Sequence, residues 1–347
     1  MANNKRLVLY NAFCYDENYM SKQQCIIIIE NGAIKSVIYE KNIEDISFGS
    51  GYQYIDCNGC LVIPGFVDSH LHLPGSCLYQ AFGIDFSDDR TINDYIARIR
   101  NTKQKNYKTI RGYGWNKSVL NSIFDLKKLK AELDMLYTNI PAILFSSDYH
   151  SCICNQYLLG LYRPYSINKI VDETGLLEEQ DVFGILHHIP CLSFGNSEIG
   201  NAVDMFQTML LKYGITSAQS LMFLGGNGND ELNVLKEMDE NSSLKIRLNL
   251  ALNVFPSDTC EEIFEKYKLM QKYKSKKISI NTVKIYIDGV VENKTAYLLE
   301  PYENTCSFGT CLWDEEELIK LCCFLDEKDI QIHAHAVGDA AVNIITK

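Results

Sequence analysis

Two histidines separated by a single residue form the sharpest chemical signal in the sequence. His70 and His72 follow an apolar run at residues 61–67, which predicts a buried strand that carries polar residues at its carboxyl end. Side chains at positions i and i+2 of a strand point to the same side, so both imidazoles can reach one ion. Neutral imidazole is a favoured ligand of zinc and similar metals. The alternative is a polar strand end whose histidines only make hydrogen bonds.

A second histidine pair and a lysine extend this signal. His333 and His335 have the same spacing on another strand-like run, followed by a glycine turn, and they too could simply form hydrogen bonds. Lys284 lies within a strand-like run of β-branched residues, where an unpaired ammonium is costly to bury. One interpretation pairs Lys284 with an acid. The other has its neutral amine carboxylated by carbon dioxide, which gives an anionic carbamate that bridges two cations.

The elements that must position these residues are predicted from hydrophobic periodicity. Residues 1–60 contain short strand-like runs, and Asn31-Gly32 between two of them predicts a hairpin, so we expect a small β domain there. Beyond residue 200, strand-like and helical segments alternate, which predicts the parallel sheet of an α/β protein. The strand-like segments of this part are residues 215–218, 245–252, 282–288 and 330–335.

Composition excludes several classes of protein. The 347 residues include 33 Lys and Arg against 44 Asp and Glu, a net charge of −11 that disfavours nucleic-acid partners. The longest aliphatic run covers only residues 26–29, far short of the roughly 20 residues of a membrane-spanning helix. We find no secretory signal, and thirteen cysteines are too few for a disulfide scaffold of this length. We therefore expect a cytoplasmic protein with no membrane partner.

Seven short motifs occur in a fixed order over nearly the whole chain. They are Phe-Val-Asp-Ser-His-Leu-His at 66–72, Gly-Tyr-Gly-Trp at 112–115, Asp-Tyr-His-Ser at 148–151, Glu-Thr-Gly-Leu-Leu at 173–177, Gly-Ile-Thr-Ser at 214–217, the segment 284–289 with Thr295-Ala296, and His-Ala-Val-Gly-Asp-Ala-Ala at 335–341. Together they resemble the amidohydrolase superfamily of metal-dependent hydrolases, in particular the YtcJ-like branch that includes N-substituted formamide deformylases.

The resemblance implies an architecture. It is an α/β fold: an incomplete TIM-type (β/α) barrel at residues 61–347 with a small, sandwich-like N-terminal β domain at 1–60. Residues 73–200 are expected to be an insertion after barrel strand 1. The segment 330–335 is then barrel strand 5, so we expect a chain truncated after that strand. Its open sheet edge would favour aggregation, and a second copy or a complementing chain would cover that edge.

The resemblance also implies a metal site. In the superfamily the first strand supplies His70 and His72, the fourth supplies carboxylated Lys284, and the fifth supplies a further histidine. His335 fits this last position better than His333, because it heads the His-Ala-Val-Gly-Asp motif. The expected cofactor is one or two divalent metal ions, for which zinc is the favoured identity.

Three residues are expected on the substrate side of this site. They are Trp115, His150 and Asp288, each at or near the end of a strand-like run. Each has a structural alternative: core packing for Trp115, a hydrogen-bonded structural histidine for His150, and a cap or salt bridge for Asp288.

The implied function is hydrolysis of a C–N bond in a small amide, formamide or cyclic amide by a metal-activated water. Such an ion lowers the pKa of bound water from about 15.7 toward about 7. The superfamily takes its proton shuttle from an aspartate on barrel strand 8, which has no counterpart here, and this predicts weak or no activity of the chain alone. The alternatives are a metal-free binding or regulatory protein without catalysis, and a deaminase or phosphoesterase on the same barrel.

Overall fold

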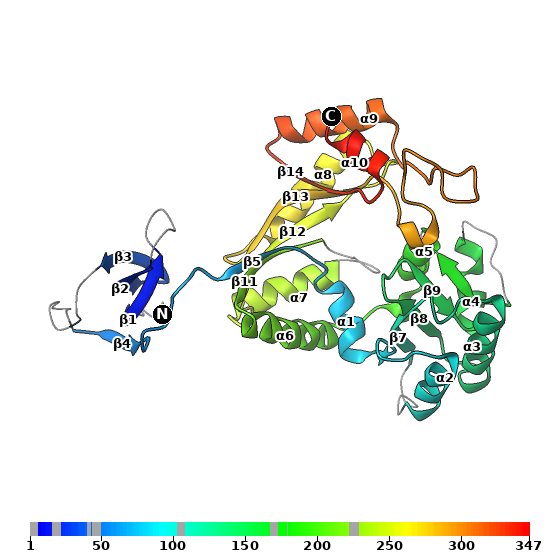
Figure 1. Ribbon diagram of the computed structural model, residues 1–347, viewed down its shortest axis with the longest axis horizontal. Helices are drawn as coiled ribbons and strands as arrows, with labels where there is room; N and C mark the ends of the chain where they lie inside the picture. Colours follow the sequence, from blue (N-terminus) through cyan, green and yellow to red (C-terminus); the bar gives the residue numbers. More distant parts are fainter. Residues whose placement is uncertain are drawn as a thin grey trace. The chain divides into compact units, whose positions relative to one another are not determined.

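A computed structural model describes residues 6–15, 22–39, 43, 50–102, 108–166, 173–178, 180–221 and 229–347. The chain forms two compact units, Met1–Phe66 and Val67–Lys347, and each is described by itself (Figure 1). No helix in the described ranges is both long enough and apolar enough to cross a membrane.

The first unit is a four-stranded sheet in the order β3-β2-β1-β4. The predicted hairpin is confirmed, because Asn31 and Gly32 join β2 to β3 with φ angles of 53° and 80°, as a type I′ turn requires. Strand β4 runs parallel to β1. The strands are β1 (Arg6–Tyr15), β2 (Lys22–Glu30), β3 (Ala33–Tyr39) and β4 (Tyr52–Asp56).

The second unit contains a half-barrel: a five-stranded sheet in the order β14-β13-β12-β11-β5. The pairs β11/β12, β12/β13 and β13/β14 are parallel, as the alternation of strands and helices predicted. The strands are β5 (Phe66–Leu71), β11 (Ile215–Ser220), β12 (Arg247–Asn253), β13 (Ile278–Tyr286) and β14 (Gln331–His335). The α/β class is therefore confirmed, as a half-barrel sheet.

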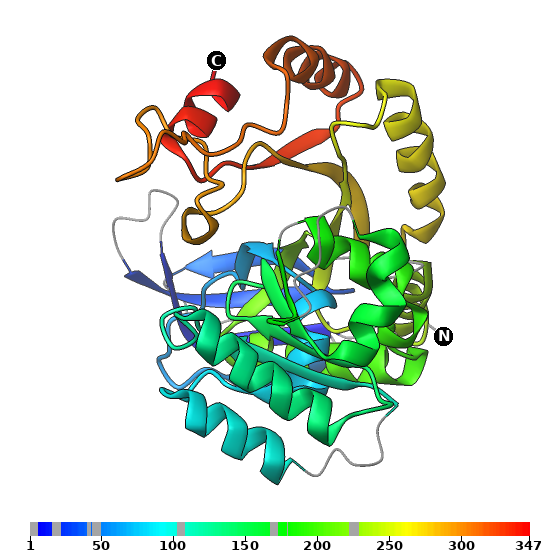
Figure 2. The same ribbon diagram turned by 90° about the vertical axis from the view of Figure 1, so that its right-hand side faces the viewer.

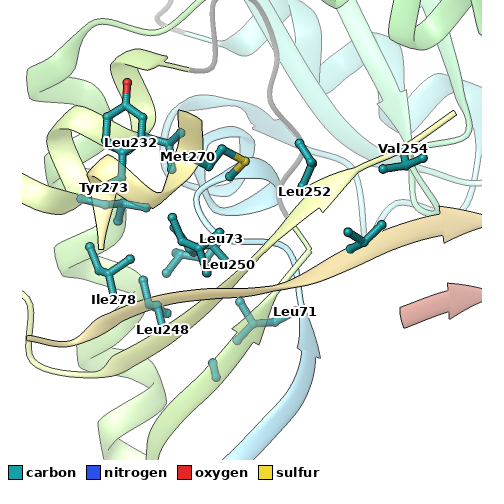
Figure 3. Close-up of a cluster of buried hydrophobic side chains, with 14 of the residues drawn as sticks. Leu71, Leu73, Leu232, Leu248, Leu250, Leu252, Val254, Met270, Tyr273 and Ile278 are labelled. Atoms are coloured by element: carbon teal, nitrogen blue, oxygen red, sulfur yellow. The ribbon is translucent and has the colours of Figure 1, made fainter. Parts of the chain in front are cut away.

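Four helices cover one face of the half-barrel, and their apolar side chains pack with those of the strands to form the core (Figures 1 and 2). They are α6 (Asn196–Lys212), α7 (Asn229–Glu240), α8 (Cys260–Met270) and α9 (Glu315–Glu327). Figure 3 shows Leu248, Leu250 and Leu252 of β12 near Leu232 of α7 and Met270 of α8. The short α10 (Asp339–Ile345) follows β14.

Between β5 and α6 the chain forms a second five-stranded sheet in the order β10-β9-β8-β7-β6. It is mixed: β6, β7 and β8 are parallel, whereas β9 runs antiparallel to both β8 and β10. Its strands are β6 (Ile84–Asp85), β7 (Ile110–Trp115), β8 (Ala142–Ser146), β9 (Ser151–Cys154) and β10 (Leu176–Glu178). Its helices are α1 (Gly75–Phe82), α2 (Ile92–Asn101), α3 (Ile123–Leu136), α4 (Gln156–Tyr162) and α5 (Gln180–His188). We call this part the insertion.

Local sequence signals explain where several helices begin and end. Thr91 with Asp94 and Thr259 with Glu262 form capping boxes at the starts of α2 and α8. The side chain of Asp314 accepts hydrogen bonds from two backbone N–H groups of α9. Gly214, with a φ of 78°, lies directly before β11 in the left-handed conformation that favours glycine after a helix.

Candidate functional site

A cavity of about 370 Å³ is lined by the half-barrel and the insertion together. The half-barrel and its helices contribute His70, His72, Glu231, Lys284, Tyr286 and His335. The insertion and the chain that follows it contribute Gly75, Ser76, Leu78, Tyr79, Gln80, Phe145, Asp148, Tyr149, His150, Val182, Leu186, Leu192, Ser193 and Phe194. The cavity therefore joins a basic, nitrogen-rich end to an apolar, aromatic wall.

The strand register brings the histidines and the lysine to the same end of the half-barrel. Strands β13 and β14 pair so that Lys284 lies opposite His333 and Tyr286 lies opposite His335. The imidazole of His70 is in turn close to that of His333, with 3.1 Å between Nδ1 of His70 and Nε2 of His333. The ring centroids of His70 and His72 are 5.3 Å apart.

Backbone carbonyls orient two of these imidazoles. Nδ1 of His72 lies 2.9 Å from the carbonyl oxygen of Leu221, and Nε2 of His335 lies 3.0 Å from that of Gly289. In a neutral ring the nitrogen that faces a carbonyl carries the proton, so the other nitrogen has the lone pair. This arrangement, one ring nitrogen donating to a carbonyl and the other basic, is typical of metal-ligating histidines.

Desolvation favours the neutral form of all four histidines, although His70 is exposed and the other three are half-buried. Desolvation lowers the pKa of His72 and of His333 to about 4, and the positive charge of Lys284 adds to the effect in both. Desolvation also lowers the pKa of His70 and of His335. Neutral imidazole is the form that binds a metal ion.

Lys284 is a buried amine, with 1% of its surface exposed. Desolvation lowers its pKa to about 8. Its Nζ lies 5.0 Å from the centroid of the Tyr286 ring, and no carboxylate of the described residues forms an ion pair with it. The pairing of Lys284 with an acid, which the sequence left open, is therefore not found in this part of the chain.

The chemistry of these donors fits a divalent ion, because neutral imidazoles and a buried amine of lowered pKa are the forms that ligation and carboxylation need. Across the described ranges, however, no group of three or more His, Cys, Asp or Glu side chains is arranged as a complete metal site. The described residues thus provide donors of the right type without a finished coordination shell.

Two residues expected on the substrate side have structural roles instead. Trp115 is 1% exposed and lies in the core of the insertion, where its Nε1–H donates to the carbonyl of Leu144 at 2.8 Å. The carboxylate of Asp288 accepts backbone N–H groups from Tyr297, Val337 and Gly338 at 2.8–3.0 Å. These contacts tie together the loops after β13 and β14, so neither side chain lines the cavity.

His150 lines the cavity, and its place on the substrate side stays a prediction. Its ring centroid lies 6.1 Å from that of His335. The turn that presents it is held by Asp148, whose Oδ1 accepts the backbone N–H of His150 at 2.9 Å. The preceding residue, Tyr149, has a φ of 62°, a conformation that is unusual for a bulky side chain.

Sequence reasoning missed two polar residues of the cavity wall. Glu231 lies in the first turn of α7, where an acid normally complements the helix dipole, so its residue type and position give no sign of a site. Tyr149 was part of a quoted motif but was given no role. No sequence motif identifies either residue as part of a site. What singles them out is that a polar atom of each is buried without a partner among the described residues, and this depends on the fold.

Comparison with known proteins agrees with this geometry. The profile of the Amidohydrolase family matches residues 53–347. The chain is 25% identical over 335 residues to the putative amidohydrolase YtcJ of Bacillus subtilis (strain 168), and the match covers 91% of this chain and 60% of YtcJ. It is 20% identical over 353 residues to the exoenzymes regulatory protein AepA of Pectobacterium carotovorum subsp. carotovorum, and this match covers 96% of this chain and 74% of AepA. It thus spans about 60% of the length of YtcJ.

A solved structure shows the same fold. The crystal structure of a metal-dependent hydrolase from Pyrococcus horikoshii OT3 superposes with a TM-score of 0.75 at 21% identity, covering 98% of this chain and 67% of that one. The histidine-bearing half-barrel, the family profile and this likeness agree with one another, and the chain belongs to the amidohydrolase family.

Proposed function

We propose that this chain supplies the metal-binding part of a site that hydrolyses a C–N bond in a small amide, formamide or cyclic amide. The observation that carries the proposal is the convergence of nitrogen donors at one end of a single cavity: His70 and His72 at the end of β5, the buried Lys284 of β13 and His335 of β14. The family membership supports hydrolysis as the reaction class.

In this proposal His70, His72, Lys284 and His335 hold one or two divalent ions, with zinc favoured. When bound, the ion supplies a Lewis acid that polarises a carbonyl and lowers the pKa of water. Leu221 and Gly289 keep the rings of His72 and His335 in the tautomer that can ligate. The neutral amine of Lys284 forms an N–C bond to carbon dioxide and loses a proton to solvent, which makes it an anionic ligand.

His150 contacts the substrate in this proposal, because it reaches the cavity beside His335. The apolar wall receives the part of the substrate that does not react. Strands β5 and β14 are the outer strands of the described half-barrel sheet, and we propose that a second copy or a complementing chain covers them.

Zinc binding tests the metal site. Isothermal titration of the purified chain with zinc should show stoichiometric binding, which a His70→Ala/His72→Ala variant loses. The matched control is His187→Ala, an exposed histidine at the end of α5, which should bind zinc as the unmodified chain does. Equal zinc binding by the double variant would overturn the site and favour the metal-free alternative.

Turnover tests the reaction. The zinc-loaded chain is incubated with a panel of N-substituted formamides and cyclic amides, and the released acid is measured by chromatography. Release that disappears in the double variant supports the proposal. Release that persists unchanged in the double variant contradicts it.

A further inference from the structure

Glu231 is a buried acid of the cavity wall that the proposed hydrolysis does not use. It lies in the first turn of α7, is 7% exposed, and its Oε2 is buried without a hydrogen-bond partner among the residues that the structure describes. Burial, with a smaller contribution from the charge of Asp230, raises its pKa to about 8. An unpartnered buried carboxyl is costly, so a group that normally satisfies it is expected in the cavity.

No cation of the described chain offers that group. The charges that act on Glu231 come from Asp230 and not from a lysine or arginine. Arg111, a buried cation that also touches the wall, lies 4.2 Å from the centroid of the Phe194 ring and donates to the backbone carbonyls of Leu192 and Ser193 at 3.1 Å. The carbonyl oxygens thus engage Nη2 of Arg111, and Arg111 is not among the charges that act on Glu231.

Aromatic rings surround the same part of the cavity. The ring of Tyr79 on α1 lies 4.7 Å from Phe145, 5.4 Å from Phe194 and 6.1 Å from Tyr149, measured between centroids. Burial and then the charge of Glu231 raise the pKa of Cys77, which lies on α1 two residues before Tyr79. The carboxyl of Glu231 therefore lies beside the helix that carries the central ring of this cluster.

A second polar atom of the wall also has no partner. The hydroxyl of Tyr149 is buried and makes no hydrogen bond within the described ranges, and the backbone of Tyr149 is held at a φ of 62°. Strained residues of this kind cluster at ligand-binding positions. Glu231 and Tyr149 thus present two unsatisfied polar atoms to one aromatic cavity.

We propose that Glu231 and the aromatic cluster of Tyr79, Phe145, Tyr149 and Phe194 bind a protonated amine on the non-reacting part of the substrate. A carboxylate neutralises the ammonium, and aromatic faces attract it through their quadrupoles. A lone carboxylate offers a hard metal ion too few oxygens, so an organic cation is the matching ligand. The substrate class is accordingly an amide that carries an apolar group and a basic amine.

This inference rests on the proposed function only for the reacting bond, since amine binding itself needs no metal. The probe is benzylamine, which is protonated at pH 7, and its neutral analogue is benzyl alcohol. Isothermal titration of the chain should give a dissociation constant for benzylamine roughly 10–100-fold lower than for benzyl alcohol.

Two variants of α7 separate the carboxyl from the rest of the cavity. Glu231→Gln should abolish the preference for the amine while leaving the affinity for the alcohol within about twofold. Glu237→Gln, at an exposed position of the same helix, should leave both affinities unchanged. A preference for the amine that survives in Glu231→Gln overturns the inference.

The unmodified chain keeps the inference testable even if Glu231→Gln fails to fold, because equal affinities for amine and alcohol would overturn it. The same titration of the His70→Ala/His72→Ala variant separates the two proposals. An unchanged preference for the amine there supports the inference whether or not zinc binds to the unmodified chain. A preference that depends on His70 and His72 instead assigns amine binding to the histidines and overturns the role of Glu231.

Discussion

Strands β8 and β9 of the insertion and the outer strands β5 and β14 of the half-barrel differ in how deeply they are buried. In the insertion, every residue of β8 and β9 is buried. In the half-barrel, the outer strands β5 and β14 are largely half-buried or exposed and carry the histidines. β8 and β9 thus lie inside the core of the insertion, whereas the half-barrel carries its histidines on strands that are partly accessible.

Asn155 is a buried polar side chain of the insertion whose hydrogen-bonding capacity is used in full. This fully buried side chain accepts from the backbone N–H groups of Ala142 and Leu158 and donates to the carbonyls of Tyr137 and Ile140, at 2.7–3.1 Å. By contrast, Lys284 and Glu231 are buried in the cavity wall without ion-pair partners in the described chain. A buried polar group is a functional candidate when its hydrogen-bonding capacity is not already used.

Asp288 tests whether a buried polar group with satisfied hydrogen bonds has a structural role. It belongs to the half-barrel, and its carboxylate already accepts three backbone hydrogen bonds. Asp288→Ala leaves three backbone N–H groups without their acceptor, and we expect the free energy of unfolding to fall by about 3–5 kcal/mol. Urea unfolding measures this loss. Asp288→Asn retains one acceptor oxygen and should lose less. A loss below about 1 kcal/mol in Asp288→Ala would show that solvent replaces these bonds.

The histidines should behave in the opposite way. His72→Ala should weaken zinc binding by roughly 100-fold and leave the urea midpoint nearly unchanged, because its ring nitrogen is proposed as a ligand. Isothermal titration measures the affinity. The pair His335→Ala and His333→Ala sharpens the assignment. A larger loss of affinity in His333→Ala would move the ligand role to the histidine that faces His70.

Glu231 should make stability depend on pH. Its pKa is about 8 in the folded chain and near 4.5 when unfolded, so the unfolded chain loses the proton first as pH rises. The stabilisation is complete below pH 4.5 and is lost progressively up to about pH 8. We expect Glu231→Gln to match the unmodified chain near pH 4.5 and to exceed it by about 4 kcal/mol at pH 8. Urea unfolding at both pH values measures this difference. An equal difference between the two proteins at both pH values would mean that the Glu231 carboxyl has a partner in the folded chain.

Trp115 provides the smallest effect and the cleanest contrast. Trp115→Phe removes the indole N–H that satisfies the carbonyl of Leu144, and we expect the free energy of unfolding to fall by about 1–2 kcal/mol. Zinc affinity should not change, because the indole lies in the core of the insertion. A loss of zinc binding in this variant would contradict the separation between core and site.

Some features of this fold could be read from neighbouring residues and others could not. The half-barrel strands lie close to where periodicity predicted them, and the Asn31-Gly32 hairpin formed as expected. The mixed sheet of the insertion was not predicted, since its pairings join segments whose order along the chain does not reveal direction. Trp115 was expected on the substrate side but lies in the core of the insertion. The reason is related, since its hydrogen-bond partner, Leu144, is 29 positions away.

The sequence by itself determined which residue types could bind a metal and which side of the strand the two histidines share. Two histidines at i and i+2 of a strand share a side wherever the strand lies, and a lysine among β-branched residues is buried in any packed sheet. Tertiary structure alone decided which polar groups were satisfied. The partners of Asp288 come from 9 to 50 positions away, and the rings around Glu231 come from other elements. Hydrogen bonding acts over about 3 Å in space, so separation along the chain does not determine it.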